Sequence, residues 1–243
     1  MNVVGRLMLL LRTLLCYFLG GCIMLVSILP VLILLLILPA RVCRENRLIF
    51  WFLNFFYRAT VGALLVPTTI VGGENLSQKP AIIIANHQSS LDIPVVGSVL
   101  NRHPHVWFAL SYYSNLPVLG FFVRRLGIAV DHENGGAARS LREGVRFAQE
   151  SNSHIIIFPE GGRFNDGTVH EFLQGFAFLA RMSRRPVIPI FMPHNGKIYP
   201  PYSFFIYWHP LKVVIGPQFM YDEHDTDETF IQRVHAWFDQ QPA

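Results

Sequence analysis

Residues 81–92 read Ala-Ile-Ile-Ile-Ala-Asn-His-Gln-Ser-Ser-Leu-Asp, an unbroken apolar run that ends in polar side chains. A short run of β-branched residues without polar alternation is typical of a strand that is buried on both faces. In open α/β sheets, ligands gather at the carboxyl ends of such strands. The stretch therefore predicts a buried strand with a candidate site, beginning at His87, directly after it.

Similar apolar runs recur further along the chain, at residues 154–158, 186–190 and 211–215. Residues 137–150 and 171–182, which lie between these runs, are predicted to form helices. Strands that alternate with helices favour an α/β domain with helices covering a sheet, and we place it at residues 67–243. A last amphipathic helix is predicted near the end, with one apolar face made by Phe230, Val234, Trp237 and Phe238.

The N-terminal part of the chain is more apolar than the rest. No charged residue occurs from residue 13 to residue 40, in a chain that is 51% hydrophobic and 15% charged overall. About 20 apolar residues suffice to cross a bilayer core, so residues 1–66 are predicted to form membrane-inserted or interfacial helices. A cleavable signal peptide is the alternative, but the run is too long for one, and residues 38–42 lack a small-residue cleavage site.

Three features predict how this segment inserts. Gly20, Gly21 and Pro30 interrupt the apolar run and predict either a tilted span or a re-entrant hairpin. Arginines flank the run on both sides, which favours a re-entrant element with both ends on the cytoplasmic face. The aromatic-rich stretch at residues 48–67 carries Arg58 and is predicted to lie as a helix in the membrane interface.

The remaining composition argues against several classes of protein. The three cysteines all lie in or beside the apolar segment, so we expect neither a disulfide framework nor a thiolate metal site. The net charge of +4 comes without a dense basic run, which favours attraction to anionic lipid headgroups over binding to nucleic acid. The aromatic segment at residues 199–208 is predicted either to touch the membrane or to pack in the core.

His87 and Asp92 are the candidate catalytic residues. On a continuous helix, residues five apart point in different directions, so these two side chains meet only if a turn intervenes. Ser89 or Ser90 as a helix N-cap would supply that turn and put Asp92 in the first helical turn. An aspartate bonded to one imidazole nitrogen leaves the other free to take a proton from a substrate hydroxyl. The alternative is that Asp92 only caps its helix.

A second polar segment, Phe-Pro-Glu-Gly-Gly-Arg at residues 158–163, also follows an apolar run. Gly161 and Gly162 let backbone amides approach an anion closely, and the guanidinium of Arg163 suits bidentate binding of a phosphate. The segment therefore predicts an anion-binding loop. The alternative is a tight turn with a surface ion pair between Glu160 and Arg163.

Together these segments resemble the 1-acylglycerol-3-phosphate O-acyltransferase family of glycerolipid acyltransferases. The family's first block, Asn-His-four residues-Asp, is matched here by Asn86, His87 and Asp92. Its third block, Phe-Pro-Glu-Gly-any-Arg, is matched by residues 158–163. Residues 187–190 are similar to the family's proline-containing strand, and residues 116–128 resemble the stretch that leads into its second block. The resemblance extends over residues 67–217.

The resemblance implies a mixed sheet flanked by helices, of the glycerol-3-phosphate acyltransferase type, preceded by an N-terminal membrane-inserted helical segment. It also implies transfer of a fatty acyl group from acyl-CoA or acyl-carrier protein to a lysolipid hydroxyl. With 1-acylglycerol-3-phosphate as the acceptor, the product is phosphatidic acid. By this resemblance His87 is the general base and Asp92 orients it. The substrate-binding residues are then Glu160, Gly161, Gly162, Arg163 and His132.

The same resemblance sets expectations for partners and location. The partners are the lysolipid, the acyl donor and the lipid bilayer, with no nucleic acid. The catalytic domain is expected on the cytoplasmic side of an inner or cytoplasmic membrane. No cofactor besides the acyl donor and no metal is expected, because the other histidines show no acidic arrangement that indicates a metal site. No serine or cysteine stands in a nucleophile elbow, which favours direct transfer without an acyl-enzyme.

Three positions lack a positive charge that the family commonly has. His132 follows Asp131 where an arginine is usual, and Ser111 and Gln174 stand where lysine is frequent. A phosphomonoester carries close to two negative charges, whereas an ordinary histidine is mostly neutral at pH 7. The acceptor is therefore either lysophosphatidic acid or a less anionic lysophospholipid or lyso-aminolipid. In the first case the candidate compensating cations are Arg124, Arg125 and Arg139.

Two other classes of protein are the competing hypotheses. A membrane scaffold that kept the fold and lost the chemistry is disfavoured, because His87, Asp92, Glu160 and Arg163 are all intact. A lipid hydrolase would use water as the acceptor. Release of free fatty acid in the absence of a lysolipid would distinguish it from a transferase.

Overall fold

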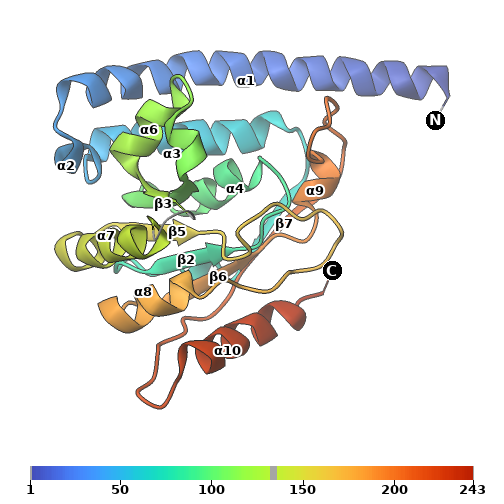
Figure 1. Cartoon of the computed structure of the whole chain (residues 1–243). Helices are drawn as coiled ribbons and strands as arrows, with labels where there is room; N and C mark the ends of the chain where they lie inside the picture. The colour runs from blue at the N-terminus through green and yellow to red at the C-terminus, as the bar shows by residue number, and fades with distance from the viewer. Residues whose placement is uncertain (1, 132–135, 243) are drawn as a thin grey trace.

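A seven-stranded sheet forms the centre of the computed structural model, which describes residues 2–131 and 136–242 (Figure 1). The strand order is β1-β7-β6-β2-β5-β3-β4. Neighbouring strands pair in parallel, except β6 with β7, which are antiparallel. The strands are β1 Thr68–Val71, β2 Ile82–Ala85, β3 His105–Leu110, β4 Gly127–Val130, β5 His154–Ile157, β6 Val187–Phe191 and β7 Leu211–Ile215. The sheet is therefore mixed, and the predicted α/β fold class is confirmed.

Helices cover both faces of the sheet (Figure 1). On one face α4 Asp92–Val99 lies against the sheet, with the N-terminal helices beyond it. The other face is covered by α7 Gly136–Glu150, α8 Gly175–Ser183 and α10 Asp227–Asp239. Short helices occur in the connections, namely α5 Ser111–Ser114, α6 Leu119–Leu126, α9 Asn195–Ile198 and the 3-10 turn Gly73–Asn75.

The isoleucines of β2 contribute to the core on both sides of the sheet. Because side chains alternate along a strand, Ile83 packs in the cluster that contains Val95 and Val96 of α4. Ile82 and Ile84 pack in the cluster formed with α8 and α10. All of β2 is buried. Side chains therefore pack on both faces of the strand end from which His87 follows.

Most of the predicted elements agree with the structure. The predicted strands correspond to β2, β5, β6 and β7, and the predicted helix at residues 137–150 corresponds to α7. The final helix buries Phe230, Val234 and Phe238, as expected from its apolar face. The helix predicted at residues 171–182 begins only at Gly175, because the preceding residues run along the loop at residues 159–160. There, for example, the amide of Leu173 donates to the carbonyl of Pro159 at 2.8 Å.

The first helix, α1 Val3–Ile37, is continuous through Gly20, Gly21 and Pro30. The prediction that these residues break the apolar run is therefore wrong. An unpaired peptide group in an apolar setting costs several kcal/mol, whereas one proline removes a single backbone hydrogen bond, so continuing the helix is favourable. Among the described residues, α1 is the one helix whose length and composition would allow it to cross a membrane.

The two long N-terminal helices pack against each other. After the short α2 Ala40–Cys43, α3 Arg47–Ala63 runs back beside α1, between α1 and the α/β domain (Figure 1). Near its end, α1 buries Val31 and Leu35 against α3. Near its start, it buries Thr13 and Cys16, and Cys16 belongs to the same apolar cluster as Ile83 of the sheet. Helix α1 is therefore attached to the rest of the molecule near both of its ends.

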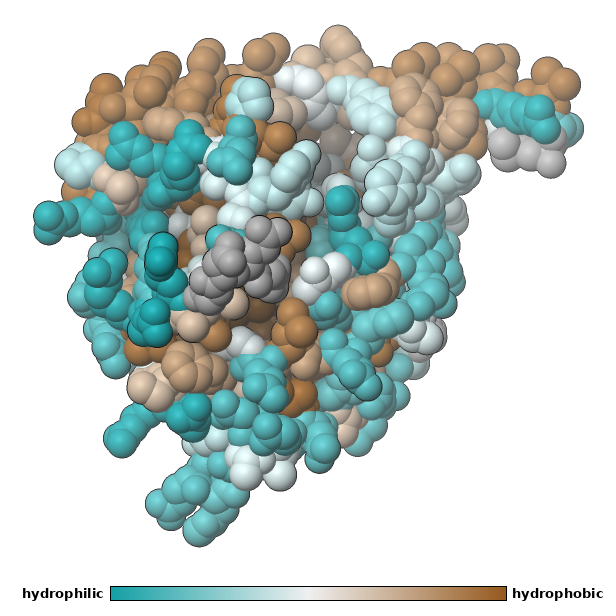
Figure 2. All heavy atoms as spheres, viewed as in Figure 1, coloured by the Kyte–Doolittle hydropathy of each residue, from teal (hydrophilic) through white to brown (hydrophobic). Residues whose placement is uncertain are grey.

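The outer face of α1 is exposed and apolar. Figure 2 shows apolar residues along most of the edge formed by this helix. Its exposed side chains include Leu7, Leu11, Phe18, Leu25, Leu29, Ile33 and Leu36. Helix α3 buries one side and exposes Leu48, Trp51 and Phe55. The interfacial position of residues 48–67 and the division into residues 1–66 and 67–243 stay predictions.

Candidate active site

The turn between β2 and α4 brings the two candidate catalytic residues together. His87 lies just beyond the carboxyl end of β2, and Asp92 is the first residue of α4. The Nδ1 atom of His87 lies 2.7 Å from Oδ2 of Asp92. The turn closes when the amide of Asp92 donates to the carbonyl of Ser89 at 3.2 Å. A turn thus brings His87 and Asp92 together although they are five residues apart, as the sequence predicted.

The predicted serine N-cap is wrong. The N-cap position of α4 is Leu91, which makes no side-chain cap hydrogen bond. The carboxylate of Asp92 binds the turn that precedes the helix, because Oδ2 accepts the amides of Gln88 at 2.6 Å and Ser89 at 2.8 Å. The Ser89 hydroxyl instead accepts the amide of Leu91 at 3.2 Å. Asp92 therefore closes the turn before α4 and contacts His87 with the same carboxylate oxygen, and it makes no helix-capping hydrogen bond. The catalytic role of the pair stays a prediction.

The groups that contact the carboxylate of Asp92 are hydrogen-bond donors. Asp92 is fully buried, and its Oδ1 accepts the side-chain amide of Asn195 at 2.8 Å. Two backbone amides and this side-chain amide are all donors, so they fit the ionised carboxylate. The proton shared with His87 then belongs on Nδ1 of the imidazole. The Nε2 atom of His87 has no hydrogen-bond partner among the described residues.

Asn86 and Asn195 support this site from two neighbouring strands. The side chain of Asn86 exchanges two hydrogen bonds with the backbone of Met192, at 3.1 and 2.8 Å, which ties the end of β2 to the end of β6. Asn195 follows β6 as the first residue of α9. Sequence reasoning did not single out Asn195. The available signal was its position, since a polar residue that follows a buried strand lies at the same edge of the sheet as His87.

The loop at residues 158–164 surrounds His87. The imidazole stacks on the ring of Phe158, with 3.9 Å between centroids and 8° between planes. The His87 amide donates to Oε1 of Glu160 at 2.7 Å, and its carbonyl accepts the amide of Phe164 at 2.8 Å. Both backbone groups and the ring of His87 are therefore positioned by this one loop.

Glu160 acts inside the loop and does not form the surface pair with Arg163 that was the alternative. It is 8% exposed, and its second oxygen accepts the amide of His170 at 2.9 Å. Burial raises the pKa of this carboxyl, and the two amides oppose that shift. Gly161 has a φ of +68°, and a side-chain carbon there would lie 2.7 Å from Leu173. The loop therefore requires glycine at this position.

Arg163 lies at the outer side of the loop. Its side chain is exposed, and one guanidinium nitrogen donates to the hydroxyl of Ser90 at 2.7 Å. Gly162 precedes it in the same turn. The guanidinium is thus next to the His87–Asp92 turn and open to solvent, where an anionic group is able to reach it. The predicted His132 lies outside the described residues.

The positions with altered charge lie in different parts of the structure. Ser111 begins α5. The side chain of Gln174 donates to Glu228 of α10 at 3.3 Å. Two candidate compensating cations are bonded to backbone carbonyls, Arg124 to that of Ser114 and Arg125 to that of Leu38.

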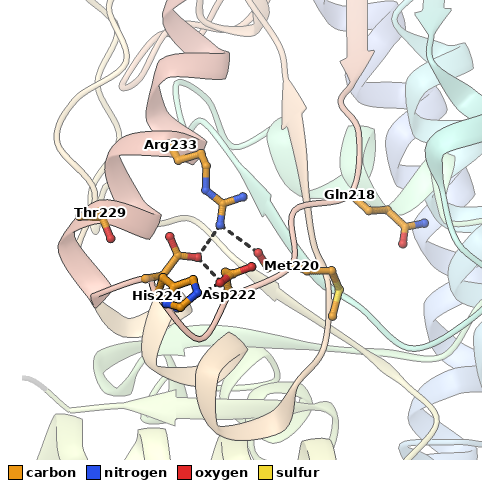
Figure 3. Close-up of a pocket in the computed structure, with 7 residues that line it drawn as sticks. Gln218, Met220, Asp222, His224, Thr229 and Arg233 are labelled. Atoms are coloured by element: carbon orange, nitrogen blue, oxygen red, sulfur yellow. Dashed lines mark hydrogen bonds and ion pairs between the residues drawn. The ribbon is translucent and has the colours of Figure 1, made fainter.

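The surface of the described residues includes hollows near to and far from the site. One of about 510 Å³ adjoins the site through Gln88 and is also lined by Asn165, Lys197 and Tyr207. Another, of about 600 Å³, lies beside the turn before α10 (Figure 3). There the guanidinium of Arg233 turns onto Asp225 and the Met220 carbonyl, so its charge serves to close that turn. The second hollow contains none of the candidate site residues.

The described residues contain no group of three or more histidine, cysteine or acidic side chains placed to hold a metal ion. The expectation that no metal or cofactor takes part stays a prediction. The arrangement at His87 provides an imidazole of which 16% of the side chain is exposed, oriented by a buried carboxylate. Such a pair is suited to remove a proton from a hydroxyl and to stabilise the resulting imidazolium.

Comparison with known proteins gave concordant matches. The acyltransferase family profile matches residues 68–193, which include His87, Asp92 and the loop at residues 158–164. A 1-acyl-sn-glycerol-3-phosphate acyltransferase of Limnanthes alba is 28% identical over 220 residues, covering 84% of this chain and 73% of the relative. One of Pseudomonas aeruginosa is 29% identical over 172 residues, covering 68% of this chain and 65% of the relative.

Among solved structures, the fold is similar to that of the 1-acyl-sn-glycerophosphate (LPA) acyltransferase PlsC from Thermotoga maritima. The TM-score is 0.78 at 21% sequence identity, and the match covers 97% of this chain and 96% of that one. At this identity the likeness concerns the fold. It extends over the N-terminal helices as well as the α/β domain.

Proposed function

This chain belongs to the acyltransferase family, and from that premise we propose that it acylates the free hydroxyl of 1-acylglycerol-3-phosphate (lysophosphatidic acid) to give phosphatidic acid. The acyl donor is acyl-CoA or acyl-carrier protein. The observation that carries the proposal is the 2.7 Å contact between His87 and the buried Asp92, which leaves Nε2 of His87 free. The names of the relatives from Limnanthes alba and Pseudomonas aeruginosa support the choice of acceptor.

In the proposed reaction, Nε2 of His87 takes the proton of the acceptor hydroxyl as its oxygen attacks the thioester carbonyl. The new carbon–oxygen bond forms, the carbon–sulfur bond breaks, and the departing thiolate takes the proton back from the imidazolium. Asp92 stabilises the positive charge that forms on the ring. Phe158 and Glu160 act as positioning residues, because they contact the ring and the backbone of His87.

Arg163 is the proposed ligand of the acceptor phosphate, assisted by the backbone of Gly161 and Gly162 and by the predicted His132. Support comes from the contact of Arg163 with Ser90, which holds an exposed guanidinium beside the catalytic turn. Glu160 also belongs to the predicted acceptor site. Since both of its oxygens accept backbone amides, we propose that its effect on the acceptor is exerted through the shape of the loop.

The packing of α1 supports a location on one side of a membrane. Thr13 and Cys16 attach one half of the helix to the molecule, and Val31 and Leu35 attach the other half. A helix held along the domain in this way is unable to cross a bilayer unless the domain enters it too. We therefore propose that α1 lies along the membrane with its apolar face immersed. The arginines that flank the apolar run on both sides support a cytoplasmic catalytic domain.

A less anionic lysolipid is the second candidate acceptor. It is favoured by the engagement of Arg124 and Arg125 with backbone carbonyls and of Gln174 with Glu228. Among the described residues, Arg163 is then the cation that contacts the catalytic turn, and one cation suits an acceptor with less negative charge.

The test is acyl transfer by the detergent-solubilised protein, with lysophosphatidic acid and a zwitterionic lysophospholipid offered side by side. A charge-assisted hydrogen bond contributes about 1.5–3 kcal/mol, so Arg163→Gln is expected to raise the KM for lysophosphatidic acid by about 10- to 100-fold. The KM for the zwitterionic lipid should change little. Arg146→Gln, an exposed arginine on α7, is the matched control.

Preference of the wild type for the zwitterionic lipid would contradict lysophosphatidic acid as the acceptor. Release of free fatty acid without any acceptor would indicate a hydrolase. Absence of activity with every donor and acceptor would favour the scaffold hypothesis.

A further inference from the structure

The segment at residues 199–208, here called the aromatic loop, connects α9 to β7 and rises toward α1 (Figure 1). It contains five aromatic residues besides Tyr199 and no charged side chain. Tyr202 is completely exposed at 103% relative accessibility, with Trp208 at 59% and Phe204 at 52%. Large aromatic side chains that are exposed together on one loop are unusual for a surface facing only water. The core-packing alternative applies to Ile206, which is buried, and not to these three.

The loop is fixed to the first half of α1. The hydroxyl of Tyr17 donates to the carbonyl of Phe204 at 3.0 Å, and their rings are 5.5 Å apart. The hydroxyls of Tyr17 and Tyr199 lie 3.2 Å apart, and the amide of Ile206 donates to the Thr13 hydroxyl at 3.1 Å. The aromatic side chains are therefore continuous with the exposed apolar face of α1.

The loop is also bonded to the catalytic turn. The hydroxyl of Ser89 donates to the carbonyl of Tyr199 at 2.7 Å, and the amide of Ser89 donates to Asp92. One residue of the catalytic turn thus joins the His87–Asp92 pair to the base of the aromatic loop. The depth of the loop relative to a surface therefore determines the depth of the site.

We infer that the aromatic loop is a second membrane anchor, which inserts Tyr202, Phe204 and Trp208 into the headgroup region of the bilayer and holds the catalytic turn at that depth. The inference rests on the proposed function, since it takes the immersed face of α1 as its starting point. Tyrosine and tryptophan are enriched where a protein meets the headgroup layer, because an apolar ring with a polar edge suits it. The partner is the lipid bilayer, and the continuity of the loop with α1 supports this choice.

The direct test measures depth and does not depend on activity. Tyr202→Cys and the control Met220→Cys are made in a Cys22→Ser background, because Cys16 and Cys43 are buried. Met220 is 52% exposed in the hollow beside α10 (Figure 3). Each variant is spin-labelled and reconstituted in phosphatidylcholine–phosphatidylglycerol vesicles. Collision with oxygen, which concentrates in lipid, is compared with collision with a water-soluble nickel chelate.

The label at residue 202 is expected to favour oxygen over the nickel chelate, while the label at residue 220 keeps the profile of a water-exposed site. Equal, water-like profiles at both positions in protein that floats with the vesicles would overturn the inference and leave the proposed reaction intact. Protein that does not float with the vesicles would contradict the placement of α1 itself.

A kinetic measurement complements the depth measurement. Tyr202→Ser combined with Trp208→Ser is expected to raise the KM for a long-chain acceptor in vesicles severalfold. The rate with a short-chain, water-soluble acceptor should be unchanged, and Met220→Ser should change neither. An equal loss with both acceptors would overturn the inference, because it would mean that the loop supports the fold or the site directly.

Discussion

Histidines gather at both ends of the sheet, but their surroundings differ. At the carboxyl end, His87 contacts a buried carboxylate and keeps Nε2 free. At the amino end, His105 begins β3 beside His154 of β5. His105 bonds to the carbonyl of His103 at 2.9 Å and to the hydroxyl of Tyr57 at 3.2 Å, and His154 accepts the amide of Ala81 at 3.0 Å.

The role of each histidine depends on its hydrogen-bond partners and on how deeply its ring is buried. Burial lowers the pKa of His105 to about 4, so this residue is neutral and structural at physiological pH. His87 has a carboxylate that stabilises the protonated ring and a second nitrogen without a partner among the described residues. His105 is therefore held neutral by burial, whereas His87 has the partner and the free nitrogen that the proposed role as a base requires.

The largest expected effect comes from removing the negative charge of Asp92, which His87 has beside it and His105 lacks. Asp92→Asn is expected to reduce kcat by about 10²- to 10⁴-fold, because the imidazolium loses its counter-ion and the new amide opposes the backbone donors of Gln88 and Ser89. Acyl transfer in detergent measures this. Asp239→Asn is the matched control, since Asp239 contacts His235 at 3.0 Å on an exposed surface. A loss in Asp239→Asn equal to that in Asp92→Asn would mean that the effect does not come from the charge beside His87.

The second prediction concerns the amino-end cluster and pH. The folded-state pKa of His105 lies below that of an unfolded histidine, so its contribution to stability is present above about pH 6.5 and is lost as the pH falls through about 4. The full loss is on the order of 3 kcal/mol. Urea unfolding in detergent between pH 7 and pH 4 measures it. Unfolding that does not become easier over this range would contradict a neutral, buried His105.

The smallest expected effect comes from Glu160, which positions His87 without contacting its ring. Glu160→Gln replaces one acceptor oxygen by a donor that faces a backbone amide. The free energy of unfolding is expected to fall by about 1–3 kcal/mol, the cost of leaving a buried donor unpaired. Denaturant unfolding measures the change, and exposed Glu171→Gln is the control. Full stability of the Glu160 variant would argue against a positioning role.

The sequence was sufficient to predict β2, β5, β6 and β7, but not the edge strands β1 and β4, nor β3, which is buried only at its first two residues. The isoleucine run of β2 is buried on both faces and is therefore uniformly apolar. The strands β1 and β4 lie at the two edges of the sheet, and every residue of β1 is exposed, so neither has that pattern. The continuity of α1 was missed because glycine and proline usually end helices that are exposed to water. In an apolar helix they are tolerated, since the backbone has no water to bond to if the helix ends.

The site was predictable where its contacts are local. His87 and Asp92 are five residues apart, so their meeting required only a turn. Asn195 reaches Asp92 across a sequence separation of 103 residues, and no local pattern indicates such a contact. The fold supplies it, because β2 and β6 are neighbours and their carboxyl ends meet at one edge.

The central claim is that His87 is the base of an acyl transfer, and acyl transfer by His87→Ala tests it most directly. Wild-type protein, His87→Ala and the control His224→Ala, whose side chain is 89% exposed, are given a thioester donor and lysophosphatidic acid. The account predicts loss of about 10²- to 10⁴-fold in kcat for His87→Ala and no change for His224→Ala. Activity of His87→Ala close to that of the wild type would contradict it.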